Sequence, residues 1–173
     1  IVPRLQPGVR RPVRAAFFGQ SSFAQYSLVT ERNIIVVAED APLEHLCALT
    51  CGTNAGAGAV LNTLKPDPDH SVAVFGVGTV GIAAIAAAKM RGARTIIAVD
   101  IHDARLELAR DVGATHTINT SAGIDTVAAI HEVVPGGVDR AFDSTGNKDV
   151  MLAAIYALGF HGVFGYVTGT GGV

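Results

Sequence analysis

The sequence predicts an α/β fold in which helices cover both faces of a parallel β-sheet. Short apolar runs alternate with helical segments between residues 72 and 167, and strict alternation of this kind specifies parallel strands joined by crossover helices. The first apolar run is followed by glycines at the spacing G-x-G-x-x-G, which here opens a helix. A chain of 173 residues can bury one sizeable core, so we expect one such domain and at most a fragment of another.

The part of the chain before the glycines predicts shorter elements. They are a bent strand or hairpin at 17–29, a strand at 33–37, a helix at 43–49 and a helix at 55–64. Asp40 and Asn54 are the expected N-caps of the two helices. Small residues at the start of the second helix predict close packing against a neighbour.

The glycines at 76, 78 and 81 form the centre of the predicted site. Gly76 permits a tight turn, Gly78 lets a pyrophosphate approach the backbone, and Gly81 lets the helix pack close to its strand. Asp100 ends the next strand, 19 residues after Gly81, where a carboxylate accepts hydrogen bonds from ribose hydroxyls. A glycine turn that merely closes a β-α unit does not explain this carboxylate, so the pattern predicts a dinucleotide site.

The remaining pattern predicts five strands and the helices between them. The expected strands are 72–75, 95–99, 115–118, 138–142 and 162–167, and the expected helices are 80–90, 104–112, 124–133 and 150–158. In the second of these helices Asp103 is the expected N-cap, and Ala104, Leu108 and Val112 share one face. Gly113 supplies the C-terminal stop. A full dinucleotide fold has six strands, and no initiator Met is present, so we expect a chain that is cut at both ends.

The composition favours a cytoplasmic protein that binds neither nucleic acid nor a membrane. The formal net charge is −2, and the four arginines within residues 1–14 lie beside prolines, which indicates a solvated arm. The longest apolar run, 82–88, is far too short to span a bilayer. Cys47 and Cys51 are too few for a disulfide scaffold and fit a reducing compartment.

Several motifs occur in a fixed order along the chain. They are FFGQSSFA from Phe17, Cys51-Gly52 before a small-residue helix, VFGVGTVG from Val74, IIAVD from Ile96, ARLELARDVGATHTIN from Ala104 and FDSTG from Phe142. This order resembles the zinc-dependent medium-chain alcohol dehydrogenases, and most closely their aryl-alcohol (benzyl-alcohol) branch. The resemblance implies a doubly wound Rossmann sheet in an NAD-binding domain at 55–173, incomplete at its C-terminus. Residues 1–54 would be a remnant of the GroES-like catalytic domain with the interdomain helix.

The resemblance also implies which residues bind NAD. They are Gly76, Gly78, Thr79, Val80, Gly81, Asp100, Ile101, Arg105, Ser144, Thr145, Gly146, Gly165, Tyr166 and Val167. Asp100 would select NAD over NADP because its charge repels a 2′-phosphate, whereas the neighbouring His102 could weaken that discrimination. One departure is Ala55, where the relatives usually carry a Thr that touches the nicotinamide.

For zinc, the resemblance implies one ligand in this chain, Cys51. It would be the third protein ligand of a catalytic site whose other ligands, a Cys and a His, belong to the missing part of the catalytic domain. Catalytic zinc needs three protein ligands, so one thiolate cannot hold it. A local site of His45, Cys47 and Cys51 is conceivable, but we expect His45 at the surface and Cys47 as a small core side chain.

The implied function is the cofactor-binding portion of an NAD-dependent zinc alcohol dehydrogenase, an oxidoreductase that interconverts small alcohols and aldehydes or ketones. We expect little turnover from this chain alone, assign it no catalytic residue, and expect an exposed sheet edge that could pair in a homo-oligomer. The alternative is a non-catalytic NAD(H)-binding module or a truncated gene product. A methyltransferase with the same β-α-β arrangement is a weaker third possibility, because the strand before Gly76 lacks an acidic residue.

Overall fold

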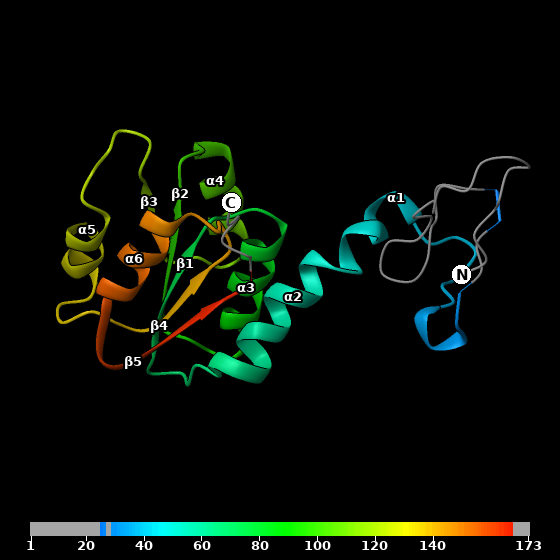
Figure 1. Cartoon of the computed structure of the whole chain (residues 1–173), viewed down its shortest axis with the longest axis horizontal. Coiled ribbons are helices and arrows are strands. Elements are labelled where there is room, and N and C mark those ends of the chain that lie inside the picture. Colours follow the sequence, from blue (N-terminus) through cyan, green and yellow to red (C-terminus); the bar gives the residue numbers. More distant parts are fainter. Residues whose placement is uncertain (1–24, 27–28, 168–173) are drawn as a thin grey trace, which may run out of the picture. The chain divides into compact units, whose positions relative to one another are not determined.

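The computed structural model describes residues 25–26 and 29–167 (Figure 1). The chain divides into two compact units, 1–41 and 42–173, which we describe separately. The second unit contains the whole sheet and all the helices labelled α. The assignment of residues 1–54 to a catalytic-domain remnant stays a prediction.

In the first unit, the expected strand at 33–37 is wrong. A 3-10 helix, η1 (Glu31–Asn33), is followed by irregular chain in which Ile35 and Val36 are 85% and 91% exposed. A β-branched run needs a neighbouring strand to complete its hydrogen bonds, and the described residues of this unit contain none. Most of the hairpin expected at 17–29 lies outside the described residues.

The second unit is built on a five-stranded parallel sheet with the order β3-β2-β1-β4-β5 (Figure 1). The strands are β1 (Ser71–Phe75), β2 (Thr95–Asp100), β3 (His116–Asn119), β4 (Val138–Asp143) and β5 (Leu158–Tyr166). β1 lies at the centre and is buried at every position. All five expected strands are confirmed, although β5 begins earlier than expected because Leu158 already pairs with Val138.

Helices cover both faces of this sheet, which confirms the doubly wound arrangement. They are α3 (Thr79–Met90), α4 (Asp103–Val112), α5 (Thr126–Val133) and α6 (Lys148–Tyr156). Val74 of β1 belongs to a core cluster with Ile85 of α3, whereas Phe75 belongs to a second cluster with Ile130 of α5. Successive side chains of a strand point to opposite faces, so β1 contributes to both cores.

A helical segment leads into the sheet from residue 43. It consists of α1 (Leu43–Leu46), the 3-10 helix η2 (Cys47–Leu49), α2 (Gly52–Gly58) and the π-helical turn η3 (Ala59–Leu64). The expected caps are wrong: Pro42, whose ring fixes φ near the helical value, precedes α1, and Asn54 lies inside α2. The expected close packing is confirmed, because a Cβ added to Gly56 would lie 2.0 Å from the carbonyl oxygen of Val80 in α3.

The buried face of α4 differs from the expected one. Leu106 and Ala109 are buried, whereas Leu108 is 50% exposed. Helical spacing alone allowed either face, and packing against the α3 side of the sheet places Leu106 in the core. Asp103 is the first residue of the helix and makes no capping bond, while Gly113 ends the helix with a φ of 146°, as expected.

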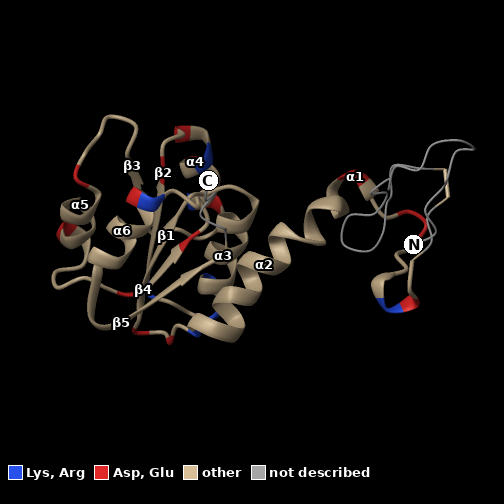
Figure 2. Cartoon of the chain, in the orientation of Figure 1, with Lys and Arg blue, Asp and Glu red and all other residues tan. Residues whose placement is uncertain are grey.

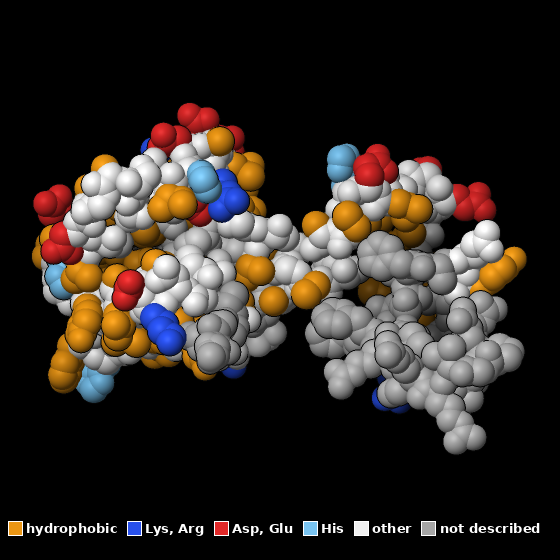
Figure 3. Space-filling view, turned by 45° about the horizontal axis from the view of Figure 1, so that its top comes forward, with side chains coloured by type: hydrophobic (Ala, Val, Ile, Leu, Met, Phe, Trp, Pro, Cys, Tyr) orange, Lys and Arg blue, Asp and Glu red, His pale blue; other side chains and the backbone are white. Residues whose placement is uncertain are grey.

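The surface of the described residues carries scattered charges and some large exposed apolar side chains. In the second unit, Lys, Arg, Asp and Glu are distributed over many elements (Figure 2). Tyr156 of α6 and Phe160 of the edge strand β5 are among the exposed apolar residues, and Figure 3 shows hydrophobic side chains on the surface. None of the helices in the described ranges combines the length and the hydropathy needed to cross a membrane. Assembly through the β5 edge stays a prediction.

Candidate functional site

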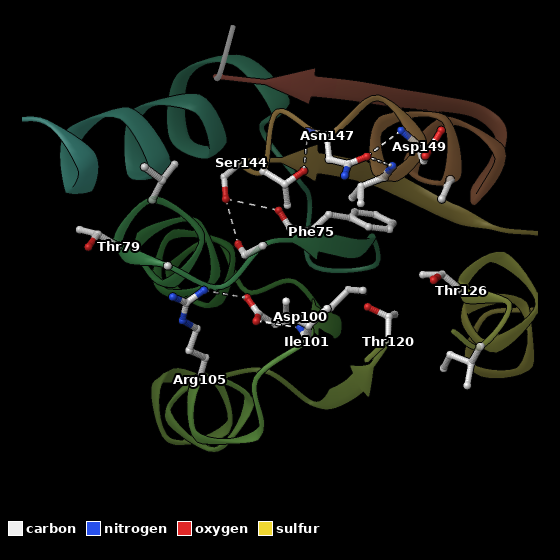
Figure 4. Close-up of a pocket in the computed structure, with 18 residues that line it drawn as sticks. Phe75, Thr79, Asp100, Ile101, Arg105, Thr120, Thr126, Ser144, Asn147 and Asp149 are labelled. Atoms are coloured by element: carbon white, nitrogen blue, oxygen red, sulfur yellow. Dashed lines mark hydrogen bonds and ion pairs between the residues drawn. The ribbon is translucent and has the colours of Figure 1, made fainter. Parts of the chain in front are cut away.

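A pocket of about 610 Å³ opens at the carboxyl ends of the central strands (Figure 4). Its walls come from the ends of β1, β2 and β4, the connection from β3 to α5, and the starts of α3, α4 and α6. The residues that line it are Phe75, Gly76, Gly78, Thr79, Val80, Val99, Asp100, Ile101, Arg105, Thr120, Ile124, Thr126, Ser144, Thr145, Asn147, Asp149, Val150 and Ala153. Ligands of open parallel sheets bind in such a crevice, where the strand order reverses, and the volume suits a small molecule.

The three glycines of the motif meet three different steric requirements. Gly76 has a φ of +80°, in the left-handed region that favours glycine. A Cβ on Gly81 would lie 1.9 Å from the carbonyl oxygen of Gly76, so α3 can pack this close to β1 only with glycine there. A Cβ on Gly78 would meet no atom within 4 Å. Packing within the protein therefore requires Gly76 and Gly81 but leaves Gly78 with a bare backbone beside the pocket.

The N-terminus of α3 presents backbone amides to this pocket. Gly78 precedes the helix and makes no side-chain cap, and its carbonyl accepts the amide of Ile82 at 2.8 Å. The first amides of a helix have no intrahelical acceptor, and the helix dipole places partial positive charge there. Gly78, Thr79 and Val80 all line the pocket, so this turn suits an anionic group such as a phosphate.

Asp100 holds the glycine turn from the end of β2 and is only 6% exposed. Its Oδ2 accepts the amide of Val77 at 2.7 Å, and its Oδ1 accepts the amides of Ile101 and His102 at 2.8 and 3.0 Å. A carboxylate offers about four acceptor positions. The backbone takes three of them, which leaves one position for a ligand in the pocket.

The carboxyl of Asp100 is ionised at neutral pH. Burial by itself would raise its pKa, but the amides of Val77, His102 and Ile101 and the guanidinium of Arg105 together hold the pKa below the ordinary value of 3.8. Arg105 Nη1 lies 3.6 Å from Asp100 Oδ2, and its side chain is about half exposed. The pocket thus contains a buried negative charge, and the half-exposed guanidinium of Arg105 lies beside it (Figure 4).

The opposite wall of the pocket is the turn that follows β4. The hydroxyl of Ser144 donates to the carbonyl oxygen of Gly76 at 2.9 Å, and the amide of Ser144 donates to the carbonyl oxygen of Phe75 at 2.9 Å. Figure 4 shows Ser144 directed at this end of β1. The turn after β4 and the glycine turn are therefore joined directly across the point where the strand order reverses.

Most of the predicted NAD-binding positions lie in this one pocket. Those in its lining are Gly76, Gly78, Thr79, Val80, Asp100, Ile101, Arg105, Ser144 and Thr145. Gly81 and Gly146 are not lining residues: Gly81 lies within α3 against the carbonyl oxygen of Gly76, and the amide of Gly146 donates to Asp143. Gly165, Tyr166 and Val167, at the end of β5, are not among the lining residues. The binding role of every one of these positions stays a prediction.

Sequence reasoning missed several lining residues and one buried acid. The lining residues are Phe75 and Val99 near the ends of β1 and β2, Thr120 and Ile124 between β3 and α5, Thr126 at the start of α5, and Asn147, Asp149, Val150 and Ala153 around the start of α6. Thr120 and Asn147 could have been found as polar residues just after a strand. Ile124 and Ala153 carry no such signal, because their place depends on how their segments lie against the sheet. The buried acid is Asp143, whose signal was a charged residue directly after the apolar pair Ala141-Phe142.

The described residues do not by themselves fit a catalytic zinc. Cys51 is exposed at the start of α2, and no three His, Cys, Asp or Glu side chains in the described ranges come together as a metal site. His45 is exposed, as expected, but Cys47 is exposed too and not a core side chain, since α1 and η2 bury none of their residues. A ligand role for Cys51 stays a prediction.

The chain is similar in sequence to known dehydrogenases. Residues 79–172 match a family model described as zinc-binding dehydrogenase. Geraniol dehydrogenase of Castellaniella defragrans is 40% identical over 148 residues, which cover 86% of this chain and 40% of that protein. Alcohol dehydrogenase 1 of Trifolium repens is 42% identical over 139 residues, covering 80% of this chain and 37% of that protein. The chain thus spans about 40% of the length of these relatives.

Solved structures share the same fold. Benzyl alcohol dehydrogenase from Acinetobacter calcoaceticus matches with a TM-score of 0.81 and 48% identity, over 88% of this chain and 42% of that one. An alcohol dehydrogenase zinc-binding domain protein from Burkholderia ambifaria matches with a TM-score of 0.81 and 52% identity, over 88% and 41%. These similarities confirm the predicted fold class.

Proposed function

Because the chain belongs to the zinc-binding dehydrogenase family, we propose that its second unit binds NAD and is the cofactor-binding part of an alcohol dehydrogenase. The proposal rests on one observation: the open side of Gly78, at the start of α3, shares a pocket with the ionised Asp100. The amides of this turn would bind the pyrophosphate, and the remaining acceptor position of Asp100 would take a ribose hydroxyl.

The chain's own residues contribute binding and orientation to the reaction. When bound, NAD would supply the hydride acceptor for the oxidation of an alcohol to an aldehyde or ketone. Asp100 orients the adenosine ribose, and its negative charge disfavours the 2′-phosphate of NADP. Arg105 beside it offsets part of that charge, so we expect the preference for NAD to be finite.

The substrate class follows only from the relatives. They are named for geraniol, benzyl alcohol and alcohols in general, so we propose a small alcohol as the substrate of the complete enzyme. We also propose that Cys51 is one zinc ligand of a site that needs donors beyond the described residues. The 173-residue chain should therefore bind NAD and oxidise alcohols slowly at most. A non-catalytic NAD(H)-binding module is the alternative.

Calorimetry with the purified chain tests this proposal. We expect one NAD per chain, much weaker binding of NADP, and no stoichiometric uptake of Zn²⁺. Absence of NAD binding would refute the cofactor site, and equal affinity for NADP would refute the role of Asp100. Zinc-dependent oxidation of benzyl alcohol or geraniol by this chain alone would refute the expected lack of turnover. If the chain binds NAD and oxidises alcohols once a chain that supplies the remaining zinc ligands is added, the alternative of a non-catalytic NAD(H)-binding module would be excluded.

A further inference from the structure

Asp143, at the end of β4, is a carboxylate with no exposed surface. Its Oδ1 accepts the amide of Thr145 at 3.0 Å and the hydroxyl of Thr145 at 2.7 Å, and its Oδ2 accepts the amide of Gly146 at 3.1 Å. No Lys, Arg or His within the described ranges forms an ion pair with it. Burying a carboxylate is costly unless hydrogen bonds satisfy it, so these three donors account for its place.

The hydroxyl of Thr145 connects Asp143 to the residue that caps α6. Its oxygen accepts the amide of Asn147 at 3.1 Å while its hydrogen is donated to Asp143. The side-chain oxygen of Asn147 in turn accepts the amides of Asp149 at 2.9 Å and Val150 at 3.4 Å. A continuous chain of hydrogen bonds therefore runs from Asp143 to the N-terminus of α6, which lines the pocket.

The same turn also lies directly beside the glycine turn. A Cβ added to Gly76 would lie 2.7 Å from Thr145 Cγ2 and 3.0 Å from Ser144 Oγ. The hydroxyl of Ser144 already donates to the carbonyl oxygen of Gly76 at 2.9 Å. Since Gly76 begins the loop that leads to Gly78, a shift of Ser144 or Thr145 would move the phosphate-facing backbone.

We propose that Asp143 is a positioning residue of the dinucleotide site. Asp143 does not line the pocket. Its hydrogen bonds fix the conformation of the Ser144–Asn147 turn, and this turn contacts Gly76 on one side and leads into α6 on the other. The inference rests on the proposed binding of NAD. It assigns a binding role to an acid that sequence reasoning did not single out.

Asp143→Asn tests the proposal because the amide has the same size as the carboxyl. It replaces one acceptor oxygen by an NH2 group, which cannot accept the hydrogen bonds that Thr145 and Gly146 donate. Titration of the full chain with NADH, followed by the blue shift of the bound nicotinamide emission, should show a Kd raised at least about 10-fold. Thr145→Val, which removes the hydroxyl that joins Asp143 to Asn147, should have a similar effect.

Asp139→Asn is the matched control. Asp139 lies in the same strand at its other end, and its Oδ2 accepts the amide and the hydroxyl of Ser71 at 2.8 and 2.7 Å. This variant also loses an acceptor for two donors, but it should leave the Kd for NADH unchanged. A loss of NADH binding in Asp139→Asn equal to that in Asp143→Asn would show a general loss of stability and overturn the positioning role.

Amide exchange measured by NMR without ligand separates this inference from the proposed function. Asp143→Asn should speed exchange at Gly76 and Val77 as well as at Gly146, while Asp139→Asn should not. If wild type and Asp143→Asn bind NADH equally, the positioning role is overturned and the proposed function stands. If wild type does not bind NADH, the proposed function fails, and unchanged exchange at Gly76 and Val77 would overturn the positioning role too. Should Asp143→Asn not fold, Thr145→Val carries the same tests.

Discussion

Replacing Gly78 by Ala tests whether a pyrophosphate occupies the open side of the glycine turn. Gly78 has φ −82° and ψ −164°, an extended conformation that alanine adopts, and the added Cβ would meet no atom within 4 Å. Alanine is a poorer N-cap than glycine but also restricts the unfolded chain, and these opposing effects should leave the free energy of unfolding within about 1 kcal/mol of wild type.

The same methyl group would occupy the place where a phosphate contacts the backbone. We expect the Kd for NADH to rise at least about 10-fold, which corresponds to about 1.4 kcal/mol of binding free energy. Fluorescence titration with NADH gives the Kd, and urea denaturation of the same sample gives the stability. Unchanged NADH affinity in Gly78→Ala would refute the placement of the pyrophosphate at this turn.

Gly81→Ala is the control with the opposite expectation for stability. Its Cβ would lie 1.9 Å from the carbonyl oxygen of Gly76, whereas ordinary contacts begin at 3.4 Å, so α3 and β1 must separate by about 1.5 Å. Because the clash is with backbone and requires so large a separation, we expect the upper end of the about 1–3 kcal/mol that overpacking costs; alanine returns about 1 kcal/mol as helix propensity, so Gly81→Ala should be about 2 kcal/mol less stable than wild type. A Gly81→Ala variant as stable as Gly78→Ala would show that the close approach of α3 is not a constraint.

Two further predictions concern stability. Because the pKa of Asp100 is lowered in the fold, its ionised form stabilises the fold above about pH 4, and this contribution is lost as the pH falls through the folded pKa. The urea midpoints of wild type and Asp100→Asn should therefore differ at pH 7 and converge below pH 3.8. A constant difference between the two midpoints at all pH values would contradict this. Leu106→Ala should lower the free energy of unfolding by about 2–4 kcal/mol because Leu106 is buried, and Leu108→Ala should lower it by less than about 1 kcal/mol because Leu108 is half exposed. If thermal denaturation showed Leu108→Ala to be the less stable variant, the face expected from the sequence would be favoured.

Local patterns were sufficient wherever an element and its partner lie close together in the chain. The run 72–75 is apolar at successive positions and becomes the fully buried central strand. The glycine turn and Asp100 belong to one β-α-β unit, so their spacing alone predicted that they would meet. The run 33–37 has similar residues but forms no strand, because strand formation depends on a pairing partner that no local pattern supplies.

The sequence by itself therefore determined the order of strands and helices, the glycine turn and the acid that faces it, since these depend on backbone conformation and on spacing within about 30 residues. Tertiary structure alone decided the other half of the pocket. Ser144 lies 68 residues from Gly76, and its hydroxyl reaches that carbonyl only because β4 pairs with β1 in the register that sets Asp143 beside Phe75. Contacts between distant segments follow from strand pairing and helix packing, and for that reason the contact between the turn after β4 and the glycine turn could be seen only in the folded chain.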